Sequence, residues 1–187
     1  MEKTIKLAEI KRADEILEVY KSGGVWLPYT DIKEVNKCLK ENEKGKVSMI
    51  VIEIEDKIVG ALKLHRPQAH IGKGGKVAVL PEYRGQGIGK LLYKSAINIF
   101  AMEGRRKVVD SLVGDNPAVL SMFEKLGFEI EAKMRKHTPG GKTLHQFAYH
   151  IDEKGIPKLG DDVKFNISAT EYMKDLKEKN NINHEVH

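Results

Sequence analysis

The sequence predicts an α/β domain with a mixed, mostly antiparallel twisted sheet, a central parallel strand–helix–strand unit and flanking helices. Three observations predict this fold. The β-rich runs Val47–Glu55 and Ile58–Leu64 are separated by a short Asp-Lys turn and predict an antiparallel hairpin. The stretch Val77–Lys90 joins an aliphatic strand to a helical pattern through alternating glycines. Strict alternation of apolar and polar residues over Phe128–Arg135, followed by T-P-G-G, predicts a half-buried strand and a second hairpin.

Length and composition are those of one globular domain with a short appendage. The chain has 187 residues, of which 41% are hydrophobic and 32% charged. No apolar run approaches the ~20 residues that span a bilayer, and the first residues do not form a signal peptide, so we expect a cytoplasmic protein without membrane contact. The net charge of +5 is spread along the chain. This suits an anionic cofactor and gives no specific reason to expect a nucleic-acid partner.

The first quarter of the chain predicts a strand and two helices. We expect a strand at Thr4–Leu7 and an amphipathic helix over Arg12–Ser22, with Thr30 as the N-cap of a second helix. The apolar loop Val25–Tyr29 between the helices carries the only tryptophan, and it either plugs the core or lines a substrate pocket. Cys38, on the second helix, is the only cysteine, which excludes an intrachain disulfide and does not suggest a covalent intermediate.

Beyond the first hairpin, the glycine-rich segment His65–Lys76 is compatible with a loop or with a strand interrupted by a bulge. A helix is expected from Ile88 to near Gly104, then a strand over Arg105–Val113 that lies parallel to the one before the helix. The pair Asn116-Pro117 is a typical helix start and Gly127 a typical helix end, which predicts a short helix over Pro117–Leu126.

The last strand of the second hairpin is expected over Lys142–Ile151, after which the composition changes. We therefore divide the chain into a domain, residues 1–151, and an extension, residues 152–187, with a linker and a short helix. Ser168 and Glu171 have the spacing of a capping box for that helix. The extension is a candidate for covering the acceptor site or for exchange between the subunits of a homodimer.

The stretch Val77–Lys90 has the features of an anion-binding turn. Glycines at 85, 87 and 89 let the backbone direct its N–H groups toward a ligand, and the helix behind adds the positive end of its dipole. A single charge at a helix start is stabilised by only ~0.3–1 kcal/mol, so several N–H groups and Arg84 would act together on a phosphate.

One interpretation of this turn is a dinucleotide-binding βαβ unit, in which Asp110 would hold a ribose. The glycine spacing argues against it, because that fingerprint is G-x-G-x-x-G, whereas here the order is G-x-G-x-G and position 90 is lysine. The predicted hairpins on both sides of the unit also differ from the βα repeats of that fold.

Two motifs in order favour a different interpretation. The segment V-A-V-L-P-E-Y-R-G-Q-G-I-G-K, followed by a helix, a strand and then N-P-A-V-L-S-M-F-E-K-L-G-F, closely resembles the GNAT superfamily of acyl-CoA-dependent N-acetyltransferases. Arg84, Gly87 and Gly89 match the pyrophosphate turn of that family, Q/R-x-x-G-x-G/A. The segment Asn116–Phe128 matches its downstream N-x-x-A/S…Y/F-x-x-x-G-F element. The resemblance covers residues 4–151.

The resemblance implies how acetyl-CoA is bound. The strand before the turn would splay from its parallel neighbour, and the cofactor would pair with the backbone of Val77 and Val79, whose side chains we expect in the core. The N–H of Val77 would polarise the thioester carbonyl, which gains negative charge when an amine attacks. Arg84 and Asn116 would contact the cofactor. The resemblance assigns the pyrophosphate to the backbone N–H groups of Gly85, Gln86, Gly87, Ile88, Gly89 and Lys90.

The sequence departs from the family pattern at Phe123. Many members carry a tyrosine there that protonates the departing thiolate, whereas phenylalanine has no proton to give. Phe123 would still pack beside the cofactor arm, and water could serve as the acid because a thiol has a pKa of about 8.5.

No acidic residue lies between Asp56 and Pro81 to act as general base. We take His70 as the candidate base. His65, His145 and Tyr149 are alternatives. The seven histidines show no metal-ligand spacing, so no metal is expected.

These observations predict an N-acetyltransferase that moves an acetyl group from acetyl-CoA directly to an amine. The acceptor is a small amine, or the N-terminus or a lysine of a peptide or protein. The alternative is a CoA-binding sensor or interaction module that has lost catalysis, which the missing acid and base favour. Acceptor specificity is expected to lie in the Gly23–Thr30 loop and the final hairpin.

Overall fold

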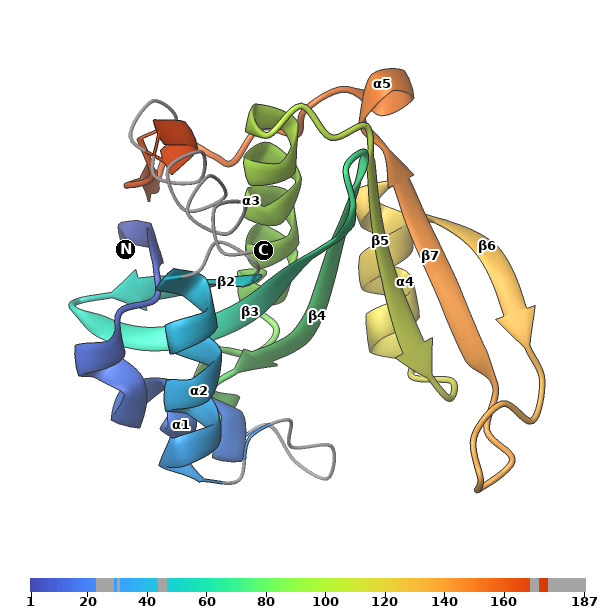
Figure 1. Ribbon diagram of the computed structural model, residues 1–187, viewed down its shortest axis with the longest axis horizontal. Coiled ribbons are helices and arrows are strands. Elements are labelled where there is room, and N and C mark those ends of the chain that lie inside the picture. The colour runs from blue at the N-terminus through green and yellow to red at the C-terminus, as the bar shows by residue number, and fades with distance from the viewer. Residues whose placement is uncertain (23–28, 30, 44–46, 169–171, 175–187) are drawn as a thin grey trace, which may run out of the picture.

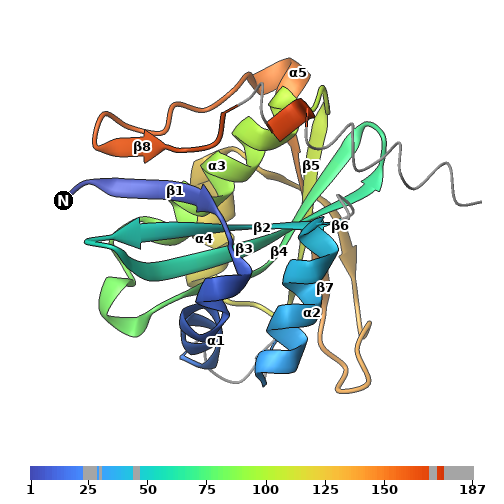
Figure 2. The ribbon, with the colours of Figure 1, turned by 60° about the vertical axis from the view of Figure 1, so that its left-hand side comes forward.

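The computed structural model describes residues 1–22, 29, 31–43, 47–168 and 172–174 (Figure 1). Eight strands form one sheet in the order β6-β7-β5-β4-β3-β2-β1-β8. Helices α1 and α2 lie on one face and α3 and α4 on the other, as the second view makes clear (Figure 2). Each face has its own hydrophobic core. The fold is therefore the predicted mixed α/β sheet with flanking helices.

The element bounds follow the hydrophobic pattern closely. The strands are β1 (Lys3–Leu7), β2 (Val47–Ile54), β3 (Lys57–Gln68), β4 (Ile71–Val79), β5 (Lys107–Val113), β6 (Glu129–Met134), β7 (Leu144–His150) and β8 (Val163–Phe165). The helices are α1 (Ala13–Lys21), α2 (Ile32–Glu43), α3 (Ile88–Met102), α4 (Pro117–Leu126) and the single turn α5 (Ile151–Lys154), with short 3-10 helices η1 (Ile10–Arg12) and η2 (Pro81–Tyr83).

The start of α2 is held by Asp31. Its carboxylate accepts hydrogen bonds from the backbone N–H groups of Lys33 at 2.7 Å and Glu34 at 3.1 Å. The predicted cap, Thr30, and the loop residues 23–28 lie outside the described residues. Tyr29 at the end of that loop is buried, and its ring packs edge-on against Tyr20, with 4.8 Å between the ring centroids.

The first hairpin is longer than predicted. Glu55 and Asp56 form its turn with φ of 50° and 61°, whereas the sequence suggested an Asp-Lys turn one residue later. Strand β3 continues to Gln68, and a tight turn leads directly into β4. The segment 65–76, which the sequence left open, is thus the second half of one hairpin and the start of the next.

Strands β4 and β5 pair only at one end. They are parallel, as predicted, but their register covers only Ile71 with Lys107 through Lys73 with Val109. Beyond that point the two strands diverge (Figure 1). We call the diverging part, Gly74–Val79 of β4 and Asp110–Val113 of β5, the β4–β5 split. The backbone edges that face each other across it are left without a strand partner, which makes them available to a ligand.

A bulge shapes the β4 side of the split. Ala61 of β3 lies opposite Ala78, but Lys63 lies opposite Gly75, so β4 carries one extra residue. Lys76 at this point has φ of 53°, an uncommon value for a residue with a side chain. The hydroxyl of Tyr20 donates a hydrogen bond of 2.7 Å to the carbonyl of Lys76. Helix α1 thereby helps to hold the bulge.

The second hairpin forms at the other edge of the sheet. Asn116 caps α4 by accepting hydrogen bonds from the N–H groups of Ala118 and Val119, and Gly127 ends the helix with φ of 88°, both as predicted. The expectation of a half-buried strand at 128–135 was wrong for Ile130, which is 46% exposed. The reason is that β6 is the edge strand of the sheet, with a bulge between Ile130 and Ala132.

The C-terminal segment joins the domain core. Strand β8, which the sequence did not predict, pairs parallel with β1, and Ile167 and Tyr172 are buried in the core under α3. Of the proposed capping box, Glu171 lies outside the described residues. Among the described residues, no helix is long and apolar enough to cross a membrane.

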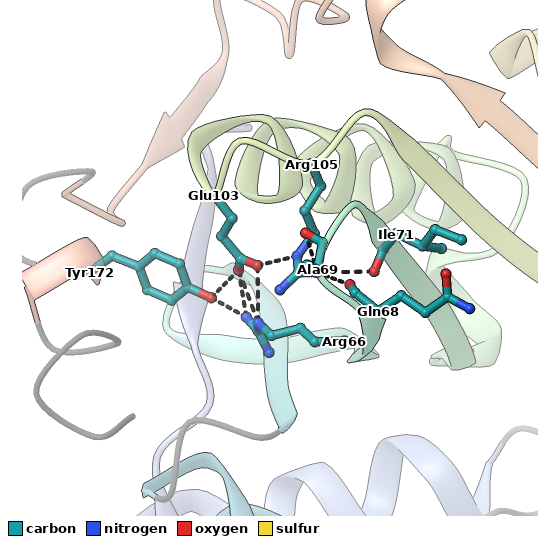
Figure 3. A network of polar contacts seen from close by, with 7 residues as sticks. All are labelled: Arg66, Gln68, Ala69, Ile71, Glu103, Arg105 and Tyr172. Atoms are coloured by element: carbon teal, nitrogen blue, oxygen red, sulfur yellow. Dashed lines mark hydrogen bonds and ion pairs between the residues drawn. The ribbon is translucent and has the colours of Figure 1, made fainter. Parts of the chain in front are cut away.

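A buried ionic network ties Tyr172 to the body of the domain (Figure 3). The carboxylate of Glu103, at the end of α3, accepts hydrogen bonds of 2.6 Å from Arg66, 2.6 Å from Arg105 and 2.7 Å from the hydroxyl of Tyr172. The Glu103 side chain is only 1% exposed. Burial acts to raise the pKa of Glu103, but the hydrogen bonds and charge of Arg66 outweigh it, so this pKa is held below its usual value.

Candidate active site

The glycine turn between β4 and α3 has the geometry of an anion site. Gly85 and Gly87 have φ of 74° and 80°, values that favour glycine, and Gly87 is the N-cap of α3. The N–H groups of Gly85, Gln86 and Gly87 have no hydrogen-bond acceptor among the described residues. Those of Ile88, Gly89 and Lys90 belong to the first turn of α3, where N–H groups have no intrahelical partner. The turn therefore presents consecutive free donors at the positive end of a helix dipole.

The side chains around the turn serve partly to shape it. Arg84 donates hydrogen bonds to the carbonyls of Val79 at 3.1 Å and of Ser22 at 2.7 Å, which ties the turn to the end of α1. Gln86 donates to the carbonyl of Glu82 at 2.8 Å. Lys90 lines a hollow of about 150 Å³ between the start of α3 and the segment before β8. The guanidinium of Arg84 thus lies beside the turn but already donates hydrogen bonds to the protein backbone.

The backbone of Val77 and Val79 faces the split. The N–H of Leu80 donates to the carbonyl of Val59 on β3 at 2.9 Å. Because backbone groups of a strand point alternately to its two sides, the N–H groups of Val77 and Val79 are directed away from β3, toward β5. The expectation of two core side chains was wrong for Val77, which is 37% exposed because it lies on the bulge, in the part of β4 that has no β5 partner, whereas Val79 packs against the core.

Phe123 lies in an aromatic cluster beneath the split. Its side chain is 2% exposed, stacks on Phe147 with 4.5 Å between centroids, and meets Tyr93 edge-on at 4.9 Å. Nearby, Gly89 brings α3 close to α4, since a Cβ added there would lie 3.4 Å from the sulfur of Met122. Asn116 uses its side-chain oxygen to cap α4.

A buried acid–phenol pair lies where the split begins; the sequence named its acid, Asp110, only as a ribose ligand and did not predict its partner. Asp110 follows the last residue of β5 that pairs with β4, is 5% exposed, and accepts a hydrogen bond from the hydroxyl of Tyr93 on α3. Burial raises the pKa of Asp110 to about 6, although Tyr93 and the N–H of Ser111 act in the opposite direction. A carboxylate enclosed in this way is not available to a ribose hydroxyl, which removes the main support for a dinucleotide site.

The structure does not bring His70 to Val77. His70 is exposed in the turn between β3 and β4, at the end where β4 and β5 are paired. Tyr149 donates its hydroxyl to the carbonyl of Gly155, also away from the split. His65, on β3, is closer to Val77 than His70 is, because it lies opposite Lys73 of β4. The position of His70 therefore does not support its role as the general base.

His145 is the most enclosed of the histidine candidates. One ring nitrogen, Nε2, lies 2.7 Å from the carboxylate of Asp115, which precedes α4. The other, Nδ1, is buried and has no hydrogen-bond partner among the described residues. His145 lies on β7 opposite Leu112, so β5 separates it from the split.

His150, Asp152 and Glu153 bring three potential metal-ligating atoms within 4.8 Å of one another. The two acids are exposed, as is common for such groups without a metal, and the cluster lies at the paired end of β5, opposite Lys107. It therefore has no geometric connection with the split.

Comparison with known proteins identifies the family. Residues 45–130 match the model of the acetyltransferase (GNAT) domain. The chain is 33% identical over 118 residues to the acetyltransferase SG1711 of Sodalis glossinidius. This match covers 63% of this chain and 81% of that protein. It is 32% identical over 77 residues to N-alpha-acetyltransferase 30 of Schizosaccharomyces pombe, covering 39% of this chain and 51% of that protein.

Solved structures share the fold at lower identity. A ribosomal-protein-alanine N-acetyltransferase from Brucella melitensis superimposes with a TM-score of 0.69 at 19% identity, over 78% of this chain and 98% of that one. The protein yncA of Salmonella typhimurium, solved with its cofactor acetyl-CoA, gives a TM-score of 0.70 at 19% identity, over 86% of this chain and 100% of that one.

The sheet with its β4–β5 split and the glycine turn at α3 define an acetyltransferase fold of the GNAT type. The chain belongs to the GNAT family and is an acetyl-CoA-dependent N-acetyltransferase.

Proposed function

We propose that acetyl-CoA binds with its pyrophosphate on the turn 85–90 and its pantetheine arm in the β4–β5 split, and that the acetyl group passes directly to an amine. The observation that carries this proposal is the presence of two sets of unpaired backbone donors, at the turn and on the strand that leads into it. One is the row of N–H groups at Gly85, Gln86 and Gly87, and the other is the edge of β4 at Val77 and Val79. A ligand with a diphosphate and an amide-bearing arm would satisfy both sets.

The reaction needs few protein groups. A neutral amine attacks the thioester carbon, a C–N bond forms, and the C–S bond breaks. Negative charge develops on the carbonyl oxygen, and the N–H of Val77 is our candidate donor to it, because a fixed donor at that position stabilises the transition state. The nitrogen then loses a proton and the thiolate gains one. Phe123 supplies no proton, so we assign this last step to solvent or to the proton released by the amine.

The relatives do not determine the acceptor. Their names include an N-alpha-acetyltransferase, a mycothiol acetyltransferase from Kocuria rhizophila and, among the structures, a chimeric spermidine N-acetyltransferase based on Vibrio cholerae. Proteins, thiol-bearing metabolites and polyamines are thus all represented. A primary amine of a small molecule or of a peptide is the acceptor class that we propose.

The test is release of free CoA thiol from acetyl-CoA in the presence of a panel of amines and peptides. Acetylated product and stoichiometric thiol are expected for at least one acceptor. Thiol release at background for every acceptor, together with a rise in thermal stability on adding acetyl-CoA, would instead support a binding module that has lost catalysis.

A further inference from the structure

A row of basic side chains lies on β3 and β4, beside the split, on the face of the sheet that carries α1 and α2. Ala61 and Ala78 belong to the hydrophobic core on that face. Since strand side chains alternate between faces, Lys63 and His65 of β3 point to the same side as Ala61. Lys73 of β4 lies opposite His65 and shares its face. The row therefore lies on the face of the sheet opposite α3. The cofactor would enter from the start of α3, on the other face.

Lys63 is held in this row by burial of its stem. Its side chain is only 10% exposed, and its closest acid is Glu41 of α2 at 3.8 Å. Its ammonium group has no hydrogen bond among the described residues. Its ion pair with Glu41 is thus long and made with a half-exposed carboxylate, and a largely buried ammonium group gains from a closer anion, so the position suits a lysine that meets an anion supplied by a ligand.

Lys76 extends the row toward the reacting centre. It lies on the bulge next to Val77, is exposed, and places its ammonium group 4.7 Å above the ring centroid of Tyr29. Lys63, Lys73 and Lys76 all act to lower the pKa of His65 to about 4, after burial, which is the largest cause. Glu41 is the acid that opposes them. The potential at His65 is therefore positive.

Two hollows adjoin the row. One, of about 280 Å³, is lined by His65, Arg66, Pro67 and Lys73. The other, of about 540 Å³, lies along α2. Its lining consists of Lys33, Asn36, Lys37, Lys40 and Glu41. Glu41 connects the two regions through its contact with Lys63. Space for a ligand is thus available beside the basic groups.

The spacing of the row matches an extended peptide. Lys76 adjoins Val77, Lys63 lies opposite Gly75, and Lys73 is four residues before Val77. At about 3.3 Å per residue, these positions lie up to roughly 13 Å along β4 from the proposed site of attack. An extended peptide with its N-terminal amine at Val77 would span that length with four residues. A small amino acid would reach only the first lysine.

We infer that the preferred acceptor is the N-terminal amine of a peptide that carries acidic residues among its first four positions, with Lys63, Lys73 and Lys76 as the groups that select it. This inference rests on the proposed function, and it names the acceptor class for the same site.

The test compares matched peptides that differ only in charge. Three acceptors begin with alanine and continue with three Glu, three Gln or three Lys residues, and free glutamate and spermidine are included as small amines. For the natural protein, kcat/KM should be about tenfold higher or more for the Glu peptide than for the Gln peptide, mainly through KM. The advantage should shrink as salt is raised.

Charge reversal at Lys73 sharpens the test. In Lys73→Glu the ratio of kcat/KM for the Glu peptide to kcat/KM for the Gln peptide should fall toward or below one. Peptides that carry a single Glu locate the contact. Among them, the peptide with Glu at its fourth position should lose the most kcat/KM in Lys73→Glu, because Lys73 is the member of the row most distant from Val77. Lys164→Glu, on strand β8 at the far edge of the sheet, makes the same change in net charge and should leave the preference unchanged.

The outcomes separate this inference from the proposed function. Equal kcat/KM for the Glu and Gln peptides, or a preference for spermidine or free glutamate over the Glu peptide, overturns the inference and leaves acetyl transfer established. If no acceptor is acetylated, both fall.

Discussion

The hydroxyl of Tyr93 on α3 donates a hydrogen bond to the carboxylate of Asp110 at the point where β4 and β5 separate. A Cβ added to Gly74 of β4 would lie 2.8 Å from the Tyr93 ring and 3.3 Å from the Asp110 carboxylate. The pair therefore fills the closed end of the split, and only glycine fits opposite it.

The first prediction concerns the pH dependence of stability. The pKa of Asp110 is raised from 3.8 to about 6 in the folded protein. Its contribution to stability is therefore fully present below pH 3.8 and is lost as pH rises through about 6, by an amount on the order of 2–3 kcal/mol. In Asp110→Asn this loss should be absent. Urea unfolding of both proteins from pH 3.5 to 7 measures it, and a constant difference between them would contradict the raised pKa.

His65 should act in the opposite direction. Its folded pKa is lowered from 6.5 to about 4, by burial first and then by Lys63, Lys73 and Lys76. Its contribution is present above pH 6.5 and is lost as pH falls toward 4. His65→Gln should remove this loss, and Lys73→Met should raise the pKa of His65 in an NMR titration. An unchanged pKa in Lys73→Met would mean that Lys73 does not face His65.

The turn can be tested with a matched pair of glycines. Gly87 and Gly104 lie at opposite ends of α3 with φ of 80° and 73°, and neither would bring a Cβ into contact. Acetyl-CoA at ~100 times its dissociation constant should stabilise the natural protein and Gly104→Glu by ~2.7 kcal/mol. Gly87→Glu should lose this gain, because its carboxylate would repel the pyrophosphate. Thermal unfolding with and without the cofactor gives the comparison, and an equal gain in all three proteins would exclude the turn as the site.

The bulge of β4 offers a fourth prediction. Tyr20→Phe removes the hydrogen bond to the Lys76 carbonyl and should cost about 1 kcal/mol of stability, because a part-buried carbonyl loses its partner. If the bulge positions the N–H of Val77, kcat/KM for acetyl-CoA should also fall severalfold. Tyr149→Phe removes a similar bond, 2.9 Å to the carbonyl of Gly155, far from the split. It should affect stability without affecting kcat/KM, and equal kinetic losses in both variants would argue against a role for the bulge.

The buried ionic network predicts a strong effect at the C-terminal segment. Glu103→Ala leaves Arg66 and Arg105 buried without their carboxylate and should cost about 3–5 kcal/mol in urea unfolding. Glu131→Ala breaks a pair with Lys107 in which the two side chains are 32% and 24% exposed, and should cost less than about 1 kcal/mol. Similar losses in the two variants would show that burial does not strengthen the first network.

Local signals in the sequence account for the elements and for the cofactor turn. Asn116 and Gly127 are correct as the ends of α4 because capping depends on residues within one helical turn. The turn expected at the glycines forms for the same reason, with positive φ at Gly85 and Gly87. Periodicity failed where position in the sheet mattered more than pattern. Ile130 is exposed because β6 is an edge strand, and Val77 is exposed because of a bulge.

By itself, the sequence determined that this protein has an anion-binding turn between a strand and a helix, a downstream capped helix and a phenylalanine at position 123. Each of these depends on residues close together in the chain. Only the tertiary structure decided where β4 parts from β5, which buried pair lies at the closed end of the split and which lysines gather beside it on one face of the sheet. Those features depend on the register between strands, and register is set by packing among residues far apart in sequence, such as Tyr93 with Asp110 and Lys63 with Gly75.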